Sequence, residues 1–267
     1  MKPIIFTSLL AANADFIGEM IADYAGRKLQ IPTQFIGNLS TLEREHLFDD
    51  GHIQVCWMCG LLYTWKIKRA IPLTLLAAPV LEEIRYQNRP IYFSDVVVHV
   101  KSRFVTFEDL DKASWAYNDP GSHSGCFIVR SHLAALGKNA DFFSKIVQSG
   151  AHQLSLQMVL NQQVDASALD STVLDMELKN SPEISGQIRV IETIGPSPIP
   201  PWVIRNDVSA ELQMVLQSLF LNMQNDSEGR DILRAGLLKR FDPVADQDYH
   251  PIRLMADEAE QVPWPAE

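Results

Sequence analysis

Three consecutive polar residues, Ser122, His123 and Ser124, have the types and the position to hold an anion. They follow the sequence Asp-Pro-Gly, and residues 119–122 together are typical of a type II turn, whose third residue needs a positive φ. Apolar residues then recur at helical spacing, namely Val129, Leu133 and Leu136. This spacing predicts a helix that Ser122 caps and Gly137 ends. The first N–H groups of a helix lack intrahelical partners and carry partial positive charge, so an anion is expected there.

Three further polar residues occupy the expected ends of strands or beginnings of helices: Tyr92, His152 and Asp170. In α/β sheets, ligands bind at these positions. Each residue also has a purely structural interpretation. Ser122 is then only a helix cap, His152 a surface or capping histidine, and Asp170 the cap of the next turn, while Tyr92 and Trp57 are core aromatics.

The sequence contains no nucleophile elbow, phosphate-binding loop or zinc-ligand spacing, so we expect no catalytic residue, no cofactor and no metal. Cys56 and Cys59 have the spacing of a redox pair. The stretch "HIQVCWMCG" nevertheless reads as a strand, with the two thiols on opposite faces. Three cysteines are also too few for a disulfide framework, so we expect reduced thiols.

Composition indicates a soluble globular protein. Of 267 residues, 46% are hydrophobic and 21% are charged, and no apolar stretch is long enough for a transmembrane helix. The net charge of −10 and the absence of a Lys/Arg cluster argue against a nucleic-acid partner. The apolar run near the N-terminus, "PIIFTSLL", is interpreted as the first strand of a sheet rather than a leader peptide.

Strand-like and helix-like segments alternate along the chain, which predicts an α/β fold. One series runs to "IYFSDVVVHV", and a second begins near Thr106 and closes with "IRVIETIG". The proline-rich "PSPIPP" is expected to be an extended crossing between the two, followed by two helices. In the first series, Ser40 and Glu43 have the spacing of a capping box.

Several stretches together resemble one known family. "FEDLDKASWAYNDPGSHSG" resembles the signature DL-x-K…DP-x-S-x-SG of phosphonate/phosphate/phosphite-type substrate-binding proteins of ABC transporters. "GAHQLSLQMVLNQQVDASALDS" resembles a second segment of that family, apart from Gln162, where Gly is usual. "QVCWMCGLLY", "IYFSDVVV" and "DQDYHPIRLM" are similar to further stretches, so the resemblance spans nearly the whole chain.

The resemblance implies a two-lobed fold of the type 2 periplasmic-binding-protein class. Each lobe would be a mixed sheet flanked by helices, with a ligand cleft between the lobes. We expect residues 1–95 to begin lobe I, residues 96–195 to form lobe II, and residues 196–267 to return to lobe I with the C-terminal helices.

The resemblance also implies a ligand site. Its contacts would come from Ser122, His123, Ser124, Tyr92 and His152. Tyr63 is carried over from the family on a less specific match. Positions at strand ends add Asp170 and Trp57 to these candidates. His123 stands where relatives often have Thr, so it either donates a hydrogen bond, charges the site or points away. Pro200 and Pro201 stand where many relatives carry an acidic residue.

The implied function is capture of a small phosphorus oxyanion (phosphonate, phosphite or phosphate) between two closing lobes, without catalysis, for uptake through an ABC transporter permease. The chain is expected to be a monomer, periplasmic if a leader has been removed and cytoplasmic if the chain as given is complete. Two alternatives stay open. One is a cytoplasmic biosynthetic enzyme on the same fold, similar to thiamine-pyrimidine or menaquinone-pathway proteins, with His152 or Cys59 in its active site, and the other is a ligand-sensing module.

Overall fold

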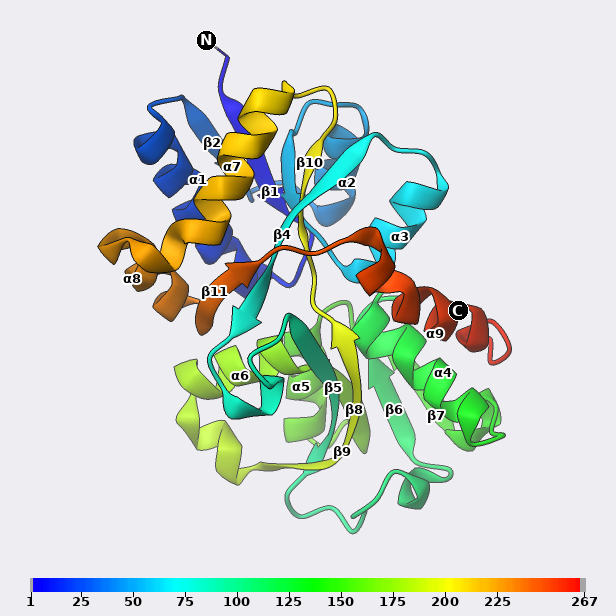
Figure 1. Ribbon diagram of the computed structural model, residues 1–267. Coiled ribbons are helices and arrows are strands. Elements are labelled where there is room, and N and C mark those ends of the chain that lie inside the picture. Colours follow the sequence, from blue (N-terminus) through cyan, green and yellow to red (C-terminus); the bar gives the residue numbers. More distant parts are fainter. Residues whose placement is uncertain (1, 265–267) are drawn as a thin grey trace. The chain divides into compact units, whose positions relative to one another are not determined.

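The computed structural model describes residues 2–264 and divides the chain into two compact units (Figure 1). The first unit comprises the described parts of Met1–Ile91 and Pro198–Tyr249, and the second those of Tyr92–Ser197 and His250–Glu267. Met1, the first residue of the expected segment 1–95, and residues 265–267, the last of the expected segment 196–267, lie outside the described residues. No helix within the described part is long and apolar enough to cross a membrane.

The first unit is built on a mixed sheet with the strand order β11-β4-β10-β3-β1-β2. Its strands are β1 (Ile4–Ser8), β2 (Thr33–Ile36), β3 (Val55–Trp57), β4 (Leu73–Leu81), β10 (Trp202–Arg205) and β11 (Leu238–Asp242). β1 runs parallel to β2 and β3, whereas β10 runs antiparallel to β3 and β4. β1 is the strand that the sequence predicts at this end of the chain.

Five α-helices accompany this sheet in the described residues: α1 (Asp15–Leu29), α2 (Thr41–Asp49), α3 (Gly60–Lys68), α7 (Ala210–Asn222) and α8 (Ser227–Ala235). The predicted capping box begins α2. The Ser40 hydroxyl accepts from the Glu43 N–H at 3.2 Å, and the Glu43 carboxylate accepts from the Ser40 N–H at 2.9 Å. α7 and α8 are the two helices expected after the proline-rich crossing.

The second unit has a five-stranded sheet with the order β7-β6-β8-β5-β9. Its strands are β5 (Ile91–His99), β6 (Ser114–Tyr117), β7 (Lys145–Gln148), β8 (Ala166–Asp170) and β9 (Ile188–Pro198). β6 runs parallel to both β7 and β8, and β5 runs antiparallel to β8 with Ser94 opposite Asp170. The accompanying α-helices are α4 (Ile128–Ala135), α5 (His152–Leu160), α6 (Ser171–Asn180) and α9 (His250–Ala259).

The C-terminal helix α9 belongs to the second unit, whereas the expected division gave residues 196–267 as a return to lobe I with the C-terminal helices. The Arg130 guanidinium on α4 donates to the carbonyls of Ala259 and Val262, both at 2.8 Å. The Ser131 hydroxyl donates to the Glu258 carboxylate at 2.6 Å. These contacts join residues more than 120 positions apart, so the local sequence pattern does not reveal them.

The capping box gives a first prediction. Ser40→Ala should lower the free energy of unfolding by about 1 kcal/mol, because it removes the acceptor for an otherwise unpaired helix N–H. Chemical denaturation followed by circular dichroism measures the change. An unchanged midpoint would show that the cap contributes nothing to stability.

Candidate functional site

The turn at residues 119–122 is held by the side chain of Asp119. The Ser122 N–H donates to the Asp119 carbonyl at 3.1 Å, and the Gly121 N–H donates to Asp119 Oδ1 at 2.7 Å. Gly121 is not among the described glycines with positive φ, so the predicted type II turn is wrong. An aspartate side chain that accepts from the N–H two residues on stabilises the turn instead.

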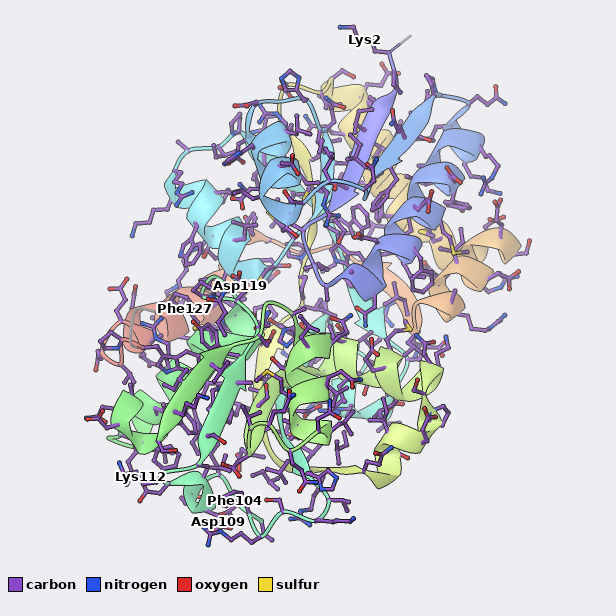
Figure 2. The ribbon with its side chains drawn as sticks, turned by 180° about the vertical axis from the view of Figure 1, so that it is seen from behind. Lys2, Phe104, Asp109, Lys112, Asp119 and Phe127 are labelled. Carbon is purple, nitrogen blue, oxygen red and sulfur yellow. The ribbon has the colours of Figure 1, made fainter. Side chains whose placement is uncertain are left out.

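Ser122 caps a continuous helical segment, residues 123–135, as the sequence predicts. Its hydroxyl accepts from the Gly125 N–H at 3.1 Å. The first five residues, His123–Phe127, form a π-helical turn in which the Phe127 N–H bonds to the Ser122 carbonyl. Helix starts leave N–H groups available to ligands, and single π turns recur at functional sites. Figure 2 shows Asp119 and Phe127 at one end of the second unit, with Phe104, Asp109 and Lys112 at the other.

The Ser124 side chain connects three elements of the second unit. Its Oγ lies 3.2 Å from His152 Nε2, at the first residue of α5, and 3.4 Å from Asp170 Oδ2, at the end of β8. Its main-chain carbonyl accepts a hydrogen bond from the hydroxyl of Ser94 on β5. Ser124, His152 and Asp170 are each at least nine-tenths buried. Three of the predicted site residues are therefore brought together.

Burial sets the charge of this cluster. It lowers the pKa of His152 to about 4, so the imidazole is neutral at neutral pH, and its Nδ1 has no partner among the described residues. Burial raises the pKa of Asp170 to about 6, although the N–H and hydroxyl of Thr172 donate to Oδ1 at 2.8 and 2.7 Å. No Lys or Arg is among the described groups that act on this pKa.

His123 is fully buried beside the same turn. Its Nε2 lies 2.9 Å from the hydroxyl of Ser197, and burial lowers its pKa to about 4. The ring is 6.4 Å from that of Tyr92, which is also buried, and His123 Nδ1 has no partner among the described residues. Of the three roles left open for His123, burial disfavours the charged one.

The other two predicted site residues lie in the first unit. The Tyr63 hydroxyl donates to the Asp246 carboxylate at 2.9 Å, and the Trp57 indole N–H donates to the Pro200 carbonyl at 3.0 Å. Trp57 also stacks on Trp202, with ring centroids 5.3 Å apart. These contacts fit the structural interpretation of both side chains. Their ligand contacts stay predictions.

Asn118 lies against the helix start, and the sequence analysis did not include it among the candidate site residues. A Cβ built on Gly125 would lie 1.8 Å from Asn118 Oδ1 and 3.1 Å from His152 Cε1, so both side chains press against the helix start. Asn118 Oδ1 is buried and lacks a partner among the described residues. The available signal was its place directly after β6, at the carboxyl end of a parallel strand.

The cluster contains Ser, His and Asp but lacks the order of a hydrolytic triad. In a triad, the carboxylate bonds to the imidazole and the imidazole activates the hydroxyl. Here both His152 and Asp170 contact the Ser124 hydroxyl, and no described carboxylate meets His152 Nδ1. With a pKa near 4, His152 is also a weak base. The geometry therefore favours binding over nucleophilic catalysis.

The expectation that Cys56 and Cys59 both lie on one strand is correct for Cys56 only. β3 ends at Trp57, and Cys59 caps α3 rather than continuing the strand. Cys56 is fully buried, and burial raises the pKa of its thiol far above the usual value, which disfavours a reactive thiolate. In the described part of the chain, no group of three His, Cys, Asp or Glu residues has metal-binding geometry.

Comparisons with known proteins agree with this architecture. The model of a family described as "ABC transporter, phosphonate, periplasmic substrate-binding protein" matches residues 18–249. A binding-protein component of a phosphonate ABC transporter from Pseudomonas aeruginosa is similar over 98% of this chain and 88% of its own, at 18% identity and a TM-score of 0.85.

Two more solved structures share the fold. A Prochlorococcus marinus protein in complex with methylphosphonate is similar over 98% of this chain and 99% of its own, at 17% identity and a TM-score of 0.85. The periplasmic aliphatic sulphonate binding protein of Escherichia coli is similar over 97% and 88%, at 12% identity and a TM-score of 0.62. These matches confirm the predicted two-lobed α/β fold class.

The close approach at Gly125 gives the second prediction. Gly125→Ala should lower the free energy of unfolding by roughly 1 to 3 kcal/mol, because the new methyl group displaces Asn118 and presses on His152. Gly186→Ala is the matched control, since a Cβ there meets nothing within 4 Å. Denaturation curves compare the two. Equal free energies of unfolding for the two variants would show that a methyl group at position 125 fits without displacing its neighbours.

The buried histidines give the third prediction. Because the folded state holds their pKa values near 4, below the usual 6.5, the unfolded state binds protons more readily. The free energy of unfolding should therefore fall as pH drops from about 6.5 to about 4, by on the order of 3 kcal/mol for each histidine. Asp170, with its raised pKa, gains stability over part of the same range and offsets some of this loss.

His123→Thr should make this acid-dependent loss smaller, because one of the two buried imidazoles is gone. Gly186→Ala, which changes no titratable group, should leave the slope as in the wild type. Urea denaturation at several pH values measures both slopes. A His123→Thr slope equal to that of the wild type would contradict the neutral, buried state of His123.

Proposed function

Since this chain belongs to the family of periplasmic substrate-binding proteins of phosphonate ABC transporters, we propose that it binds a small phosphonate or related phosphorus oxyanion at the helix start formed by residues 122–125. The observation that carries the proposal is the Ser124 hydroxyl, buried against His152 and Asp170 at the first turn of a helix. Ser122, His123 and Tyr92 complete the proposed set of ligand contacts.

The chemistry of this helix start suits an oxyanion. Early N–H groups of the segment 123–135 point along the helix dipole and stabilise negative charge. The hydroxyl of Ser124 adds a donor. The buried Nδ1 atoms of His123 and His152, which lack a partner among the described residues, are available for a further polar contact. Hydrogen bonds from such groups to a charged acceptor are stronger than those between neutral partners.

Short-range donors must supply the affinity, because the chain as a whole repels anions. Its net charge is −10. Long-range electrostatic attraction of an anion is therefore absent, and preorganised hydrogen bonds replace it. The buried position of Ser124 lowers the local dielectric, which strengthens each of these bonds.

In this proposal the ligand is held and released unchanged. The family consists of substrate-binding transport proteins. The Ser124 cluster lacks the arrangement that activates a nucleophile, which supports binding over the biosynthetic-enzyme alternative. We propose delivery of the ligand to an ABC transporter permease in the periplasm, and closure of the two units over the ligand stays a prediction. Incubation followed by mass spectrometry should recover the ligand intact.

Methylphosphonate is the first ligand to test, because the Prochlorococcus marinus protein of the same fold was solved in complex with it. Phosphite and phosphate follow, since they differ from it by one substituent on phosphorus. At 100 times its Kd, a bound ligand should add about 2.7 kcal/mol to the free energy of unfolding. A thermal-shift screen across these anions ranks them. A folded, ligand-free protein that responds to none of them would contradict the proposal.

Two serine variants give the fourth prediction. Ser124→Ala should weaken methylphosphonate binding by about 1 to 3 kcal/mol, because the bound anion loses a donor in a buried site. Ser122→Ala should weaken binding and also lower the free energy of unfolding by about 1 kcal/mol, because its hydroxyl caps the helix. Titration calorimetry and denaturation curves separate the two effects.

Ser40→Ala is the control for a lost cap remote in sequence from the proposed site. It should lower stability and leave the Kd for methylphosphonate unchanged. If Ser124→Ala binds methylphosphonate as tightly as the wild type, the anion does not sit at this helix start.

A further inference from the structure

A hollow of about 480 Å³ lies in the second unit, away from the Ser124 cluster, and its size is in the range of small-molecule sites. Its lining comes from three segments, 99–104, 112–113 and 162–165. The first begins at the end of β5, and the other two lead directly into β6 and β8. The hollow therefore lies where these parallel strands begin, whereas the Ser124 cluster lies where they end. Figure 2 shows Phe104 and Lys112 at this end of the unit and Asp119 at the other.

Arg189 on β9 fixes the loop that forms one wall of the hollow. Its guanidinium donates to three carbonyls of the loop, those of Val100, Ser102 and Phe104, at 3.3, 2.9 and 2.7 Å. These bonds are charge-assisted and therefore strong. Arg103 thus extends into its surroundings from a stretch of main chain that is held on both sides.

Arg103 and His99 bring hydrogen-bond donors that have no partner among the described residues. Arg103 Cζ lies 5.2 Å from the centroid of the Phe104 ring, and the guanidinium makes no hydrogen bond or ion pair within the described part of the chain. His99 Nδ1 accepts from the Lys101 N–H at 3.2 Å, so the neutral ring carries its proton on Nε2. Because both side chains line the hollow, an acceptor bound there meets a planar guanidinium and an imidazole N–H.

The carboxylates near these donors are held by other groups. Asp109, on the same loop, accepts from two main-chain N–H groups through Oδ2 at 2.9 and 3.0 Å. These bonds, with a smaller effect of the Arg103 charge, hold the pKa of Asp109 below its usual value. Asp165, which lines the hollow, accepts from the N–H and the hydroxyl of Ser114 through Oδ2 at 2.8 and 2.6 Å. Asp165 Oδ1 has no partner among the described residues, so the lining also offers one acceptor.

Lys112 and Gln162 line the hollow from main chain in the left-handed region, with φ of 62° and 56°. Glycine adopts this region at the lowest cost, and it is the usual residue directly after a helix cap, which is the position of Gln162 after α5. Strained residues recur at functional sites. The Lys112 ammonium donates to the Asp141 carbonyl and adds a second cation to the lining, and the Gln162 amide has no partner among the described residues.

The chemistry of the lining selects one kind of ligand. Arg103 and Lys112 outweigh the one carboxylate of the lining, so the hollow attracts an anion although the chain has a net charge of −10. A guanidinium matches the geometry of a carboxylate or a phosphate. Hydroxyl groups suit the rest of the lining, because a hydroxyl both donates to Asp165 and accepts from Gln162.

We propose that this hollow is a second ligand site, which binds a small organic oxyanion that also carries hydroxyl groups, such as a sugar acid or a sugar phosphate. Arg103 and His99 hold the charged group, and Asp165 and Gln162 hold the hydroxyls. The site is independent of the proposed function, because it shares no residue with the helix start at residues 122–125.

Gluconate and glucose 6-phosphate are the probes, and glucose is the uncharged control. Titration calorimetry of the folded wild type should give at least one anion a Kd at least about tenfold below that of glucose, as expected for hydrogen bonds to a charged group. The anion with the lower Kd shows whether the site takes a carboxylate or a phosphate. If neither anion binds more tightly than glucose, the proposal is overturned.

Arg103→Ala should weaken binding of the tighter probe about tenfold to 100-fold, because the anion loses its charged donors. Arg85→Ala is the matched control. Arg85 also lies against the ring of the residue that follows it, at 5.5 Å, but belongs to the first unit. The control should leave the Kd of the probe unchanged, and circular dichroism verifies that both variants fold. Equal Kd values for Arg103→Ala and the wild type would rule out this site.

Gln162→Gly gives a readout that a purely structural residue would not give. The variant should raise the midpoint of urea denaturation, because glycine relieves the left-handed main chain, and should weaken probe binding about twofold to tenfold. Unchanged binding in the stabilised variant would contradict the placement of the ligand hydroxyls at Gln162.

Methylphosphonate separates the two sites. A probe in the hollow should keep its Kd when methylphosphonate is present in excess. If methylphosphonate displaces the probe and Ser124→Ala weakens its binding, the probe occupies the helix start and the second site is wrong. If methylphosphonate, phosphite and phosphate all fail to bind while Arg103→Ala weakens binding of the probe, the proposed function fails and the second site stands.

Discussion

The second unit is organised around the burial of one carboxylate without a cation. Asp170 is nine-tenths buried, and the described residues satisfy it with hydroxyl and N–H donors alone. Such an arrangement is stable only when each donor is held in place, because a buried acceptor without a partner costs about 1 to 3 kcal/mol or more. Thr172 is fixed by the start of α6, and Ser124 by the cap that Ser122 provides. The position of the helix start therefore determines whether the buried carboxylate of Asp170 has its donor from Ser124.

The sheet of the second unit places three helix starts along one of its edges. β7, β6 and β8 are neighbouring parallel strands, so their carboxyl ends share an edge of the sheet. β6 leads through the Asp119 turn to the segment 123–135, β7 leads to α5 with His152 at its start, and β8 leads to α6 with Asp170 as its cap. β5 joins antiparallel to β8, and its Ser94 holds the main chain of Ser124. The strand register of this sheet thus brings residues from four segments together.

What the sequence could predict follows from the range of each interaction. The caps by Ser40 and Ser122 depend on residues three positions apart, and both were predicted correctly. The turn type was missed because the Asp119 side chain, rather than a positive φ at Gly121, holds the turn. The contacts of Ser124 with Asp170 and of His123 with Ser197 span 46 and 74 positions. Pattern and propensity carry no information at that distance. The family resemblance predicted His123, Ser124 and His152 as site residues, and the end of a predicted strand indicated Asp170. Neither kind of evidence predicted which hydrogen bonds these side chains make.

His123 adds a buried imidazole beside the helix start without adding a charge. A charged imidazole at this position would add a cation beside the helix start and would relieve the demand on Asp170. Complete burial lowers its pKa and keeps it neutral instead, so it contributes a polar atom without a charge. The electrostatic character of the cluster is then set by the partial charge of one helix end and by one carboxylate. Because no other ionised group is present among the described members of the cluster, hydroxyl and N–H donors must supply the contacts to an anion bound there.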